Sequence, residues 1–418
     1  MTRNYFTYSI LVLGLCLSGV SYAANSQNTE LKQILSRAFA KDPELLEAKA
    51  NTMIAHSQTE QAISGHYPTI SVFGRQSLED YSRYNTNDRN NKFTPGAQAN
   101  LNLYSFGAVE KKVAYSEANE ASFRYKYDET KENIAYKITE LYLMAIRSKD
   151  AIAAQQRGLA RLRSIIGEIE AIADNDEGRR SELVQAEARM FAVEQQQNTS
   201  ERELQDALSQ LQRYSGKAVK ANGLADPFKG MTAAQLKKRY SQNQYLHPSY
   251  QTAQAKITSA HAGVEAERAS RYPKLDLVGQ ATKEDRQVYL NVSWDMFNRA
   301  SSYSVQEKAQ TLEAEKSRLE QTKLDLEEKT RTALINLEEY RRQIGTLSKQ
   351  VNSLYEVTNF YKLQFQIAKR SLLDLLNAEN ELLSAELSRV STEYQLRHSV
   401  LDYLYSQGMT TKWATDLK

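Results

Sequence analysis

Four of the six prolines in this chain divide it into two matching halves. Pro43 and Pro68 are 25 residues apart, and Pro248 and Pro273 repeat that spacing at an offset of 205 residues. A tyrosine precedes the second proline of each pair. A repeat of this length predicts two copies of one supersecondary unit, each burying its apolar face against the other copy.

The first 23 residues have the pattern of a secretory signal peptide. Arg3 precedes an apolar stretch over residues 10–20, and residues 21–23 form a small-x-small cleavage site. We therefore expect the mature chain to begin near Ala24 and to lack Cys16, the one cysteine of the sequence. Lipidation of Cys16 is the alternative, but Leu15 stands where a lipoprotein signal has a small residue.

The composition argues against several classes of function. After the signal peptide no run of 18 apolar residues is present, so no membrane-spanning helix is expected. Lys and Arg (54) nearly balance Asp and Glu (51), which argues against a nucleic-acid surface. The five histidines are dispersed, and no phosphate-binding loop or nucleophile motif is present. We therefore expect no enzyme activity, no cofactor and no metal site.

Two long stretches without proline predict the main helices. Apolar residues recur every seven positions from Val305 to Tyr361, and a second row four residues on becomes apolar toward its end. This pattern predicts coiled-coil packing over about 68 residues, or roughly 100 Å of helix. The stretch from Ala108 to about Ile172 is its counterpart in the first half.

Shorter helices are expected beside the long ones. Polar breaks near residues 174–180 and 367–371 end the long helices, and the halves then align at an offset of 192, with Gly216 matching Gly408. In the first half we expect two short helices, over residues 31–66 and 180–214. Stacked end to end, two such helices match the length of one long helix.

Strand patterns follow the second proline of each pair. Apolar and polar side chains alternate over residues 97–103 and 288–296, which is the period of a strand with one apolar face. We expect one hairpin in each half, over about 69–106 and 274–297. The first hairpin has the longer polar tip, over residues 85–96.

The expected organisation is therefore a duplicated chain with a joint. Its predicted parts are a signal peptide (1–23), a first repeat (24–214), an equatorial joint (215–235), a second repeat (236–408) and a C-terminal tail (409–418). Four strands cannot close a cylinder, and open edges in hydrocarbon leave backbone groups unpaired. Two chains would supply eight strands and three would supply twelve, and both numbers occur in bacterial barrels.

With these features the sequence resembles the TolC family of outer-membrane channel proteins, which serve tripartite efflux and type I secretion. The resemblance covers the whole mature chain. It rests on the duplicated halves, the Tyr-Pro before each first strand, the aromatic ends of the second strands (Phe106 and Phe297) and the helix-tip motifs. It implies a mainly α fold with a small β part, in which a homotrimer shares a twelve-stranded barrel continued by a long α-helical barrel. Residues 179–186 are most similar to the branch that serves protein secretion.

The resemblance also implies roles for residues near the helix tips. A periplasmic gate would use Glu182, Arg370 and Phe365, and a lumenal selectivity ring would use Asp374 and Asn377. The tip residues expected to dock an adaptor are Gly178, Arg179, Arg180, Ala368, Lys369 and Ser371. Ordinary helix-end charges and a solvated helix face are the alternative interpretation.

Two departures from the family pattern affect these tips. Gly178 lies only four residues before Glu182, and Ala368 stands where the second tip usually has glycine. At the opposite end, the aromatic residues Phe106, Trp294 and Phe297 are expected to be interfacial membrane anchors.

Two functional hypotheses follow. In the first, the chain is a passive exit duct in the outer membrane, in contact with lipid and opened at its tip by a periplasmic adaptor and an inner-membrane transporter, driven by ATP or by protons. Its cargo would be proteins or small molecules. In the second, the chain is a structural or adhesive coiled-coil protein anchored in the envelope without channel activity.

Overall fold

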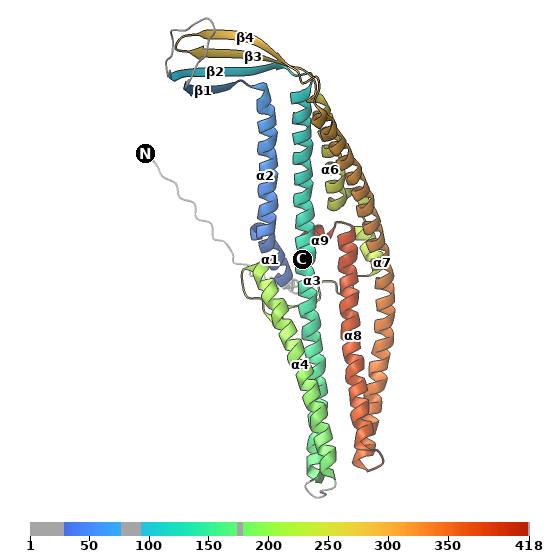
Figure 1. Cartoon of the computed structure of the whole chain (residues 1–418). Coiled ribbons are helices and arrows are strands. Elements are labelled where there is room, and N and C mark those ends of the chain that lie inside the picture. The colour runs from blue at the N-terminus through green and yellow to red at the C-terminus, as the bar shows by residue number, and fades with distance from the viewer. Residues whose placement is uncertain (1–28, 77–92, 174–178, 417–418) are drawn as a thin grey trace, which may run out of the picture.

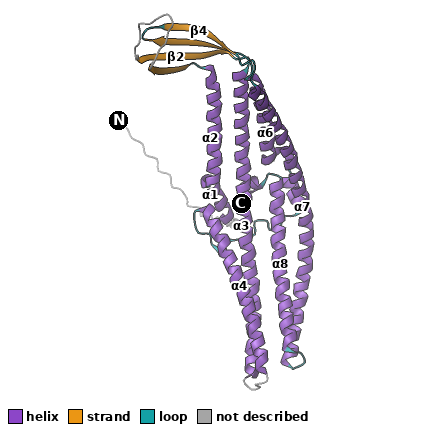
Figure 2. Ribbon diagram, viewed as in Figure 1, coloured by secondary structure: helices purple, strands orange, loops and turns teal. Residues whose placement is uncertain are grey.

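The computed structural model describes residues 29–76, 93–173 and 179–416 and shows an elongated, mainly helical chain with one small sheet at one end (Figures 1 and 2). The predicted signal peptide with Cys16, the tip residue Gly178 and most of the first hairpin tip lie outside the described residues.

The order of the elements repeats between the halves. The first half contains α1 (Thr29–Lys41), α2 (Pro43–Ile63), β1 (Thr69–Gln76), β2 (Phe93–Tyr104), α3 (Ala108–Ala173) and α4 (Arg180–Ser215). The second half contains α5 (Ala233–Tyr240), α6 (Pro248–Ala269), β3 (Lys274–Thr282), β4 (Arg286–Ser293), α7 (Arg299–Gln366) and α8 (Leu372–Ser406), followed by α9 (Thr410–Asp416). Short 3-10 turns are present at Ser64–His66, Ala221–Gly223 and Gln244–Leu246.

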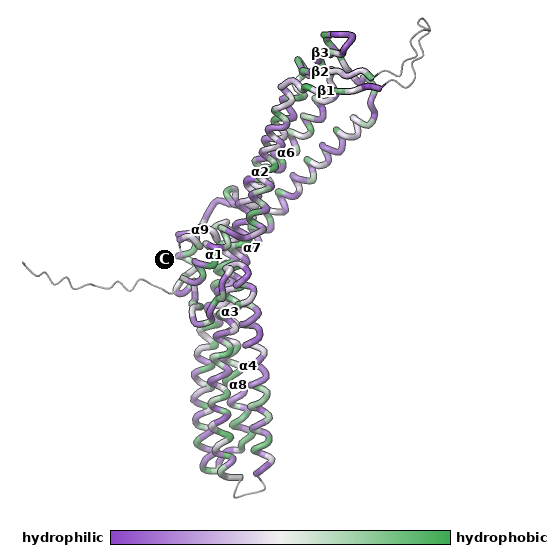
Figure 3. Tube along the Cα trace, turned by 90° about the vertical axis from the view of Figure 1, so that its left-hand side faces the viewer, coloured by the Kyte–Doolittle hydropathy of each residue, from purple (hydrophilic) through white to green (hydrophobic). Residues whose placement is uncertain are grey.

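The long helices form the centre and one edge of a layer of helices. The helices α3 and α7 have 66 and 68 residues, in agreement with the two predicted long helices. Near the sheet, neighbours follow the order α2, α3, α6, α7, and toward the tips the order is α4, α3, α8, α7. Apolar and polar residues alternate along the lower helices in Figure 3, as coiled-coil packing requires.

The expected single helix over residues 31–66 is wrong, because the chain breaks at Asp42. Asp42 has extended backbone angles (φ −64°, ψ 129°), and its carboxylate accepts a hydrogen bond of 2.9 Å from the backbone N–H of Glu44. Pro43 follows as the first residue of α2, where its missing N–H costs nothing. The first proline of the pair therefore starts a helix, and α1 is separate from it.

His247 caps α6 in the same way that Asp42 caps α2, at the repeat offset of 205. Its Nδ1 accepts a hydrogen bond of 3.1 Å from the backbone N–H of Ser249, and Pro248 is the first helical residue. Its Nε2 lies 2.8 Å from the carbonyl oxygen of Tyr405 and donates to it, because Nδ1 is the acceptor. The ring is 1% exposed. A buried imidazole thus joins the start of α6 to the end of α8.

The largest buried cluster lies where the short helices meet, halfway along the molecule. It joins side chains of α1, α3, α4, α5, α8 and α9 with Leu224 and Phe228 of the predicted joint. Residues 409–418, predicted as a tail, contain the packed helix α9, in which Trp413 is 1% exposed. The carboxylate of Glu132 on α3 accepts hydrogen bonds from the backbone N–H groups of Thr410 and Thr411 at the start of α9.

Buried ion pairs join α3 to α8 between this cluster and the tips. Arg161 Nε lies 2.7 Å from Glu379 Oε2, and Arg161 Nη2 lies 3.3 Å from Glu386 Oε2. Arg157 Nε lies 3.4 Å from the other oxygen of Glu386. Both carboxylates are less than 10% exposed, so each depends on these arginines for a counter-charge.

The four strands form one antiparallel sheet in the order β1-β2-β3-β4, so β1 and β4 are its free edges. Residues that pair directly on neighbouring strands lie on the same face of the sheet. Apolar residues pair with each other on one face: Ile70 lies opposite Ala99, and Leu277 lies opposite Leu290. The apolar face is uncovered along its edge strands, where the exposed fractions are 77% for Ile70, 87% for Val72, 78% for Val288, 61% for Leu290 and 69% for Val292. The opposite face is mainly polar, although it includes Phe73 and Val278, and there Asn102 donates a 2.8 Å hydrogen bond to Asp276.

The predicted strand limits need two corrections. β2 begins at Phe93, inside the expected tip, and Pro95 pairs with Gly74. β4 ends at Ser293, so Trp294 and Met296 do not continue its alternation. In the described part of the chain, none of the helices is both long enough and apolar enough to cross a membrane.

His247 predicts a pH dependence of stability. Burial lowers the pKa of His247, although its hydrogen bond to Tyr405 and the nearby Glu132 oppose this. Because the folded pKa lies below the unfolded value of about 6.5, the unfolded chain binds the proton first, and stability should fall as the pH drops below about 6.5. His247→Asn keeps a side-chain oxygen that can cap the helix and does not titrate. The thermal midpoint of this variant should therefore fall less at low pH than that of the wild type.

The comparison must be made at each pH, because the hydrogen bond to Asp402 raises the pKa of His398 and acts in the opposite direction. The difference in thermal midpoint between wild type and His247→Asn removes that contribution. If this difference is constant from pH 7 to pH 5, His247 does not cause the pH dependence.

Arg161 predicts a large loss of stability on substitution. Arg161→Met leaves two buried carboxylates short of a counter-charge and should lower the free energy of unfolding by about 3 kcal/mol. The exposed Arg163 on the same helix is the matched control, and Arg163→Met should change stability by less than about 0.5 kcal/mol. Chemical denaturation of both variants checks this, and equal losses would contradict a role for the buried pairs.

Candidate functional site

The turn between α7 and α8 is a Schellman motif that has alanine where glycine is favoured. The backbone N–H of Lys369 donates to the carbonyl of Gln364 at 2.8 Å, and that of Ala368 donates to Phe365 at 2.9 Å. Ala368 has a φ of 54°, in the left-handed region. Ala368 therefore adopts the backbone conformation that glycine adopts most easily, at a conformational cost.

The next residues begin α8 with a side-chain cap. Ser371 Oγ accepts a 3.2 Å hydrogen bond from the backbone N–H of Asp374 and donates a 2.8 Å hydrogen bond to its carboxylate. Asp374 and Asn377 lie one turn apart on α8, and both keep solvent access. Asp374 is thus fixed at the helix end, where a carboxylate is favoured by the helix dipole.

Within one chain Arg370 contacts its own tip rather than Glu182. Its guanidinium lies 3.8 Å from Asp374 Oδ2, its Nε donates to Gln364 Oε1 at 3.2 Å, and its Cζ lies 4.0 Å from the ring centre of Tyr361. The structure therefore brings Arg370 together with the predicted lumenal carboxylate and does not pair it with Glu182. A link between Arg370 and Glu182 would have to join two chains.

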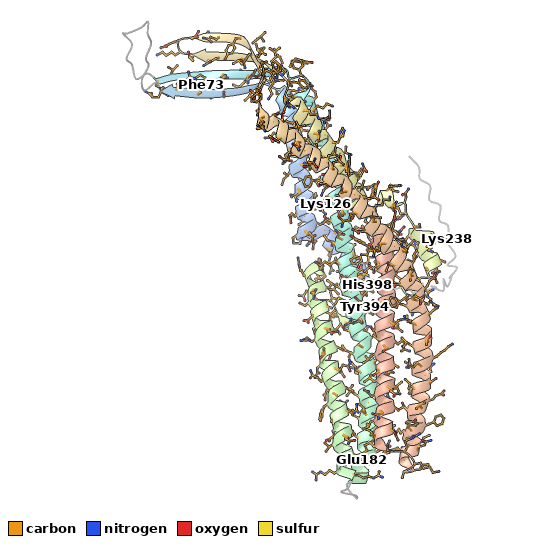
Figure 4. All side chains as sticks on the ribbon, turned by 45° about the vertical axis from the view of Figure 1, so that its right-hand side comes forward. Phe73, Lys126, Glu182, Lys238, Tyr394 and His398 are labelled. Carbon is orange, nitrogen blue, oxygen red and sulfur yellow. The ribbon has the colours of Figure 1, made fainter. Side chains whose placement is uncertain are left out.

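The α3–α4 tip leaves Glu182 available. Glu182 lies in the first turn of α4, which begins at Arg180 without a side-chain cap (Figure 4). Its carboxylate is 3.9 Å from Arg179 Nη1, and Oε2 has no hydrogen-bond partner among the described residues. An ion pair of this length across a partly exposed surface is weak.

Phe365 is a buried residue and not a surface aromatic. It is 5% exposed and belongs to a cluster that joins the ends of all four lower helices. The cluster also contains Leu162 of α3, Ala186 of α4 and Leu372 of α8. Within one chain, Phe365 therefore holds the two helical hairpins together next to the predicted gate charges.

Aromatic residues gather where the sheet joins the helices. The rings of Tyr104 and Phe106 are 4.7 Å apart, and that of Tyr272 lies 6.2 Å from Phe106. Trp294 donates through Nε1 to the carbonyl of Arg271 at 3.2 Å, and Phe297 is 91% exposed. Phe106 and Trp294 thus lie at the base of the sheet, and Phe297 follows three residues after Trp294.

The buried ion pairs between α3 and α8 were missed from the sequence. A signal existed, because Glu379 and Glu386 are seven residues apart and Arg157 and Arg161 are four apart, so each pair occupies one helix face. Among the described residues, no group of three or more His, Cys, Asp and Glu side chains is placed to hold a metal ion.

Ala368 yields a direct test of the tip turn. Ala368→Gly should stabilise the tip by about 0.5–1 kcal/mol, because removing the left-handed alanine outweighs the extra chain entropy of glycine. The matched control, Ala192→Gly at an exposed site inside α4, should destabilise by about 1 kcal/mol. Amide hydrogen exchange at Ala368 and Lys369 measures the effect, and faster exchange in Ala368→Gly would contradict it.

Comparison with known proteins agrees with this geometry. Outer membrane efflux protein BepC of Brucella suis biovar 1 (strain 1330) is 21% identical over 425 residues, which cover 96% of this chain and 90% of that protein. The solved outer-membrane channel OprN has a TM-score of 0.78 at 17% identity, over 93% of this chain and 92% of that chain. The outer membrane protein VceC of Vibrio cholerae has a TM-score of 0.77 at 14% identity, over 92% and 98% of the two chains.

The family model described as outer membrane efflux protein matches residues 34–217 and 240–402, one segment in each half. This match and the shared fold place the chain in the outer membrane, with its helices extending into the periplasm. The chain belongs to the outer membrane efflux protein family.

Proposed function

We propose that the chain is a passive exit duct, formed by three copies that share one barrel and one helical tunnel. The observation that carries this proposal is the open sheet with its uncovered apolar face. In hydrocarbon the unpaired N–H and C=O groups of β1 and β4 would cost several kcal/mol each. Three copies supply twelve strands, an even number that occurs in bacterial barrels, and the family resemblance favours three over two.

The helices support a ring because the two edges of the layer differ. The α7 edge exposes apolar side chains, namely Tyr303, Leu324, Ile335, Tyr355, Phe360 and Leu363. The α2 and α4 edge exposes Leu46, Met53, Ile54, Val184 and Phe191. No residue of α7 before Leu326 is buried. Two different apolar edges on one protomer would pair head to tail, and such contacts form a ring when the rotation between copies closes.

The tip is the proposed gate. Glu182 of one copy and Arg370 of the next would form a link, since among the described residues the ion pairs that these two side chains make are long, at 3.9 Å for Glu182 and 3.8 Å for Arg370. Each such link contributes roughly 0.2–1 kcal/mol, so a docking partner could open the end. A periplasmic adaptor, recruited by an inner-membrane transporter, would dock on Arg179, Arg180, Ala368, Lys369 and Ser371. Asp374 and Asn377 would line the entrance and favour cations.

At the other end, the aromatic residues at the base of the sheet would lie at the membrane interface. All three side chains are large and exposed, namely Phe106, Trp294 and Phe297. Amphipathic and aromatic side chains are favoured at lipid headgroups. The apolar face above them would contact lipid, and the polar face with Asn102 and Asp276 would line the lumen.

The cargo separates two versions of this proposal. Family membership favours small molecules, whereas the tip sequence is most similar to the protein-secretion branch. Deleting the gene should raise drug sensitivity in the first case and remove secreted proteins from the medium in the second. A structural or adhesive role is the rival function, and it predicts neither change.

Channel recording tests the duct and its gate. Purified protein in planar bilayers should form discrete channels, and Arg370→Ala should increase their conductance because an inter-chain link is lost. Arg163→Ala, which removes an exposed arginine elsewhere on α3, is the control and should leave conductance unchanged. The absence of channels in wild type and Arg370→Ala alike would favour the structural role.

A double variant tests whether the two charges form one link. If Arg370 pairs with Glu182, then Glu182→Ala should open the channel as much as Arg370→Ala does, and the double variant should add nothing further. Additive increases would show that the two residues act separately. Retention of the trimer must be checked by light scattering in each variant.

A further inference from the structure

A groove runs along the upper helices and ends at the sheet. It consists of two cavities of about 420 and 620 Å³ that share Tyr115, Gly263 and Lys308. On α3 its lining residues recur at helical spacing, as Ala108, Lys112, Tyr115, Asn119, Ser122 and Lys126. The first and last residues of this stripe are 18 positions apart, which corresponds to roughly 27 Å of helix.

Small residues on α6 create the depth of the groove. Ser259, Ala260 and Gly263 face it from α6, between the longer side chains of α3 and α7. A β-carbon at Gly263 would lie 3.2 Å from the ring of Tyr115, so glycine allows that ring to lie close to α6. The depth of the groove therefore follows from the small residues of α6. The groove continues upward to the strands β2 and β3.

The groove opens on the side of the polar face of the sheet. Its upper cavity is lined by Asn102 and Asp276, which are hydrogen-bonded to each other on that face. Leu101 and Leu277 of the same strands point the opposite way. If the apolar face contacts lipid, as proposed above, then the groove faces the lumen of the tunnel.

Lysines outnumber acidic residues in the lining of this groove. Its lining contains the five lysines Lys112, Lys126, Lys256, Lys274 and Lys308, from α3, α6, β3 and α7, against the three acids Glu267, Asp276 and Glu315. Lys126 lies 3.1 Å from Glu129 and Lys308 lies 3.9 Å from Glu307. Within the described residues the other three lysines have no carboxylate within 4.0 Å.

We propose that this lysine-lined groove is a lumenal binding site for anionic groups, phosphate or carboxylate, on molecules that pass through the tunnel. The substrate class is therefore multivalent anions, or larger cargo that carries several anionic groups along its length. Several ammonium groups spaced along one groove attract such groups together more strongly than isolated surface lysines do. In a ring of three copies the groove would be repeated around the lumen.

This inference rests on the proposed duct, and it is tested by binding, which requires no conduction. Intact protein in detergent is titrated calorimetrically with inorganic triphosphate, with citrate, and with spermine as a probe of opposite charge. We expect both anions to bind, spermine not to bind, and affinity to fall with added salt. Pyrophosphate, whose charge near neutral pH is close to that of citrate, separates chemistry from charge. Tighter binding of pyrophosphate than of citrate would identify phosphate-bearing cargo, and equal binding would indicate recognition of charge alone.

Matched variants locate the site. Lys112→Gln combined with Lys256→Gln should weaken anion binding by tenfold or more. Lys237→Gln combined with Lys238→Gln removes the same charge from exposed positions on α5, outside the groove, and should leave the affinity within about twofold (Figure 4). Circular dichroism and the oligomeric state confirm that each variant is folded.

Three results would overturn the proposal: no anion binding by wild type, equal weakening in both pairs of variants, or equally tight binding of spermine. Channel recording on the same preparation keeps the two hypotheses separate. Anion binding lost in the groove variants of a protein that forms no channels would support the site and count against the duct. Channels without anion binding would support the duct and refute the site.

Discussion

The structure depends on backbone groups that one chain cannot pair by itself. The strands β1 and β4 end a four-stranded sheet, and among the residues that the structure describes no further strand pairs with their outer edges. Because one face of the sheet is apolar and uncovered, water cannot satisfy these groups if that face enters lipid. The proposed ring would pair these backbone groups between copies. Below the sheet, the same ring would bury the two different apolar edges of the helical layer against each other.

The two halves share the positions of their helix caps more closely than the residue types at those positions. The cap of α2 is a carboxylate, Asp42, whereas the cap of α6 is the imidazole of His247, and both receive a backbone N–H before a proline-initiated helix. Gly216 and Gly408 both have positive φ, at 65° and 62°. Only Gly408 is also confined, since a β-carbon there would lie 2.8 Å from Pro248. The backbone just after α8 is therefore packed more closely against its neighbours than the backbone just after α4.

Much of the fold could be predicted because its signals are local. Proline, heptads and strand alternation depend on residues close in sequence, so the long helices and the four strands were found. The break at Asp42 was missed although its signal is local, an aspartate cap directly before a helix-starting proline. The end of β4 at Ser293 was also misplaced. The packed helix α9 was not found, because the burial of Trp413 depends on neighbours that are distant in sequence. For the same reason, the partners of Arg161 could not be identified before α3 and α8 were known to be adjacent.

The sequence by itself determined the doubled plan, the helical class and the position of each hairpin, because residue spacing and proline geometry act within the chain. The tertiary structure decided which charges meet. It placed Arg370 beside Asp374, buried Phe365 in the tip and brought lysines from four elements to one groove. Such contacts depend on the rotation of packed helices about their axes, which periodicity alone leaves open.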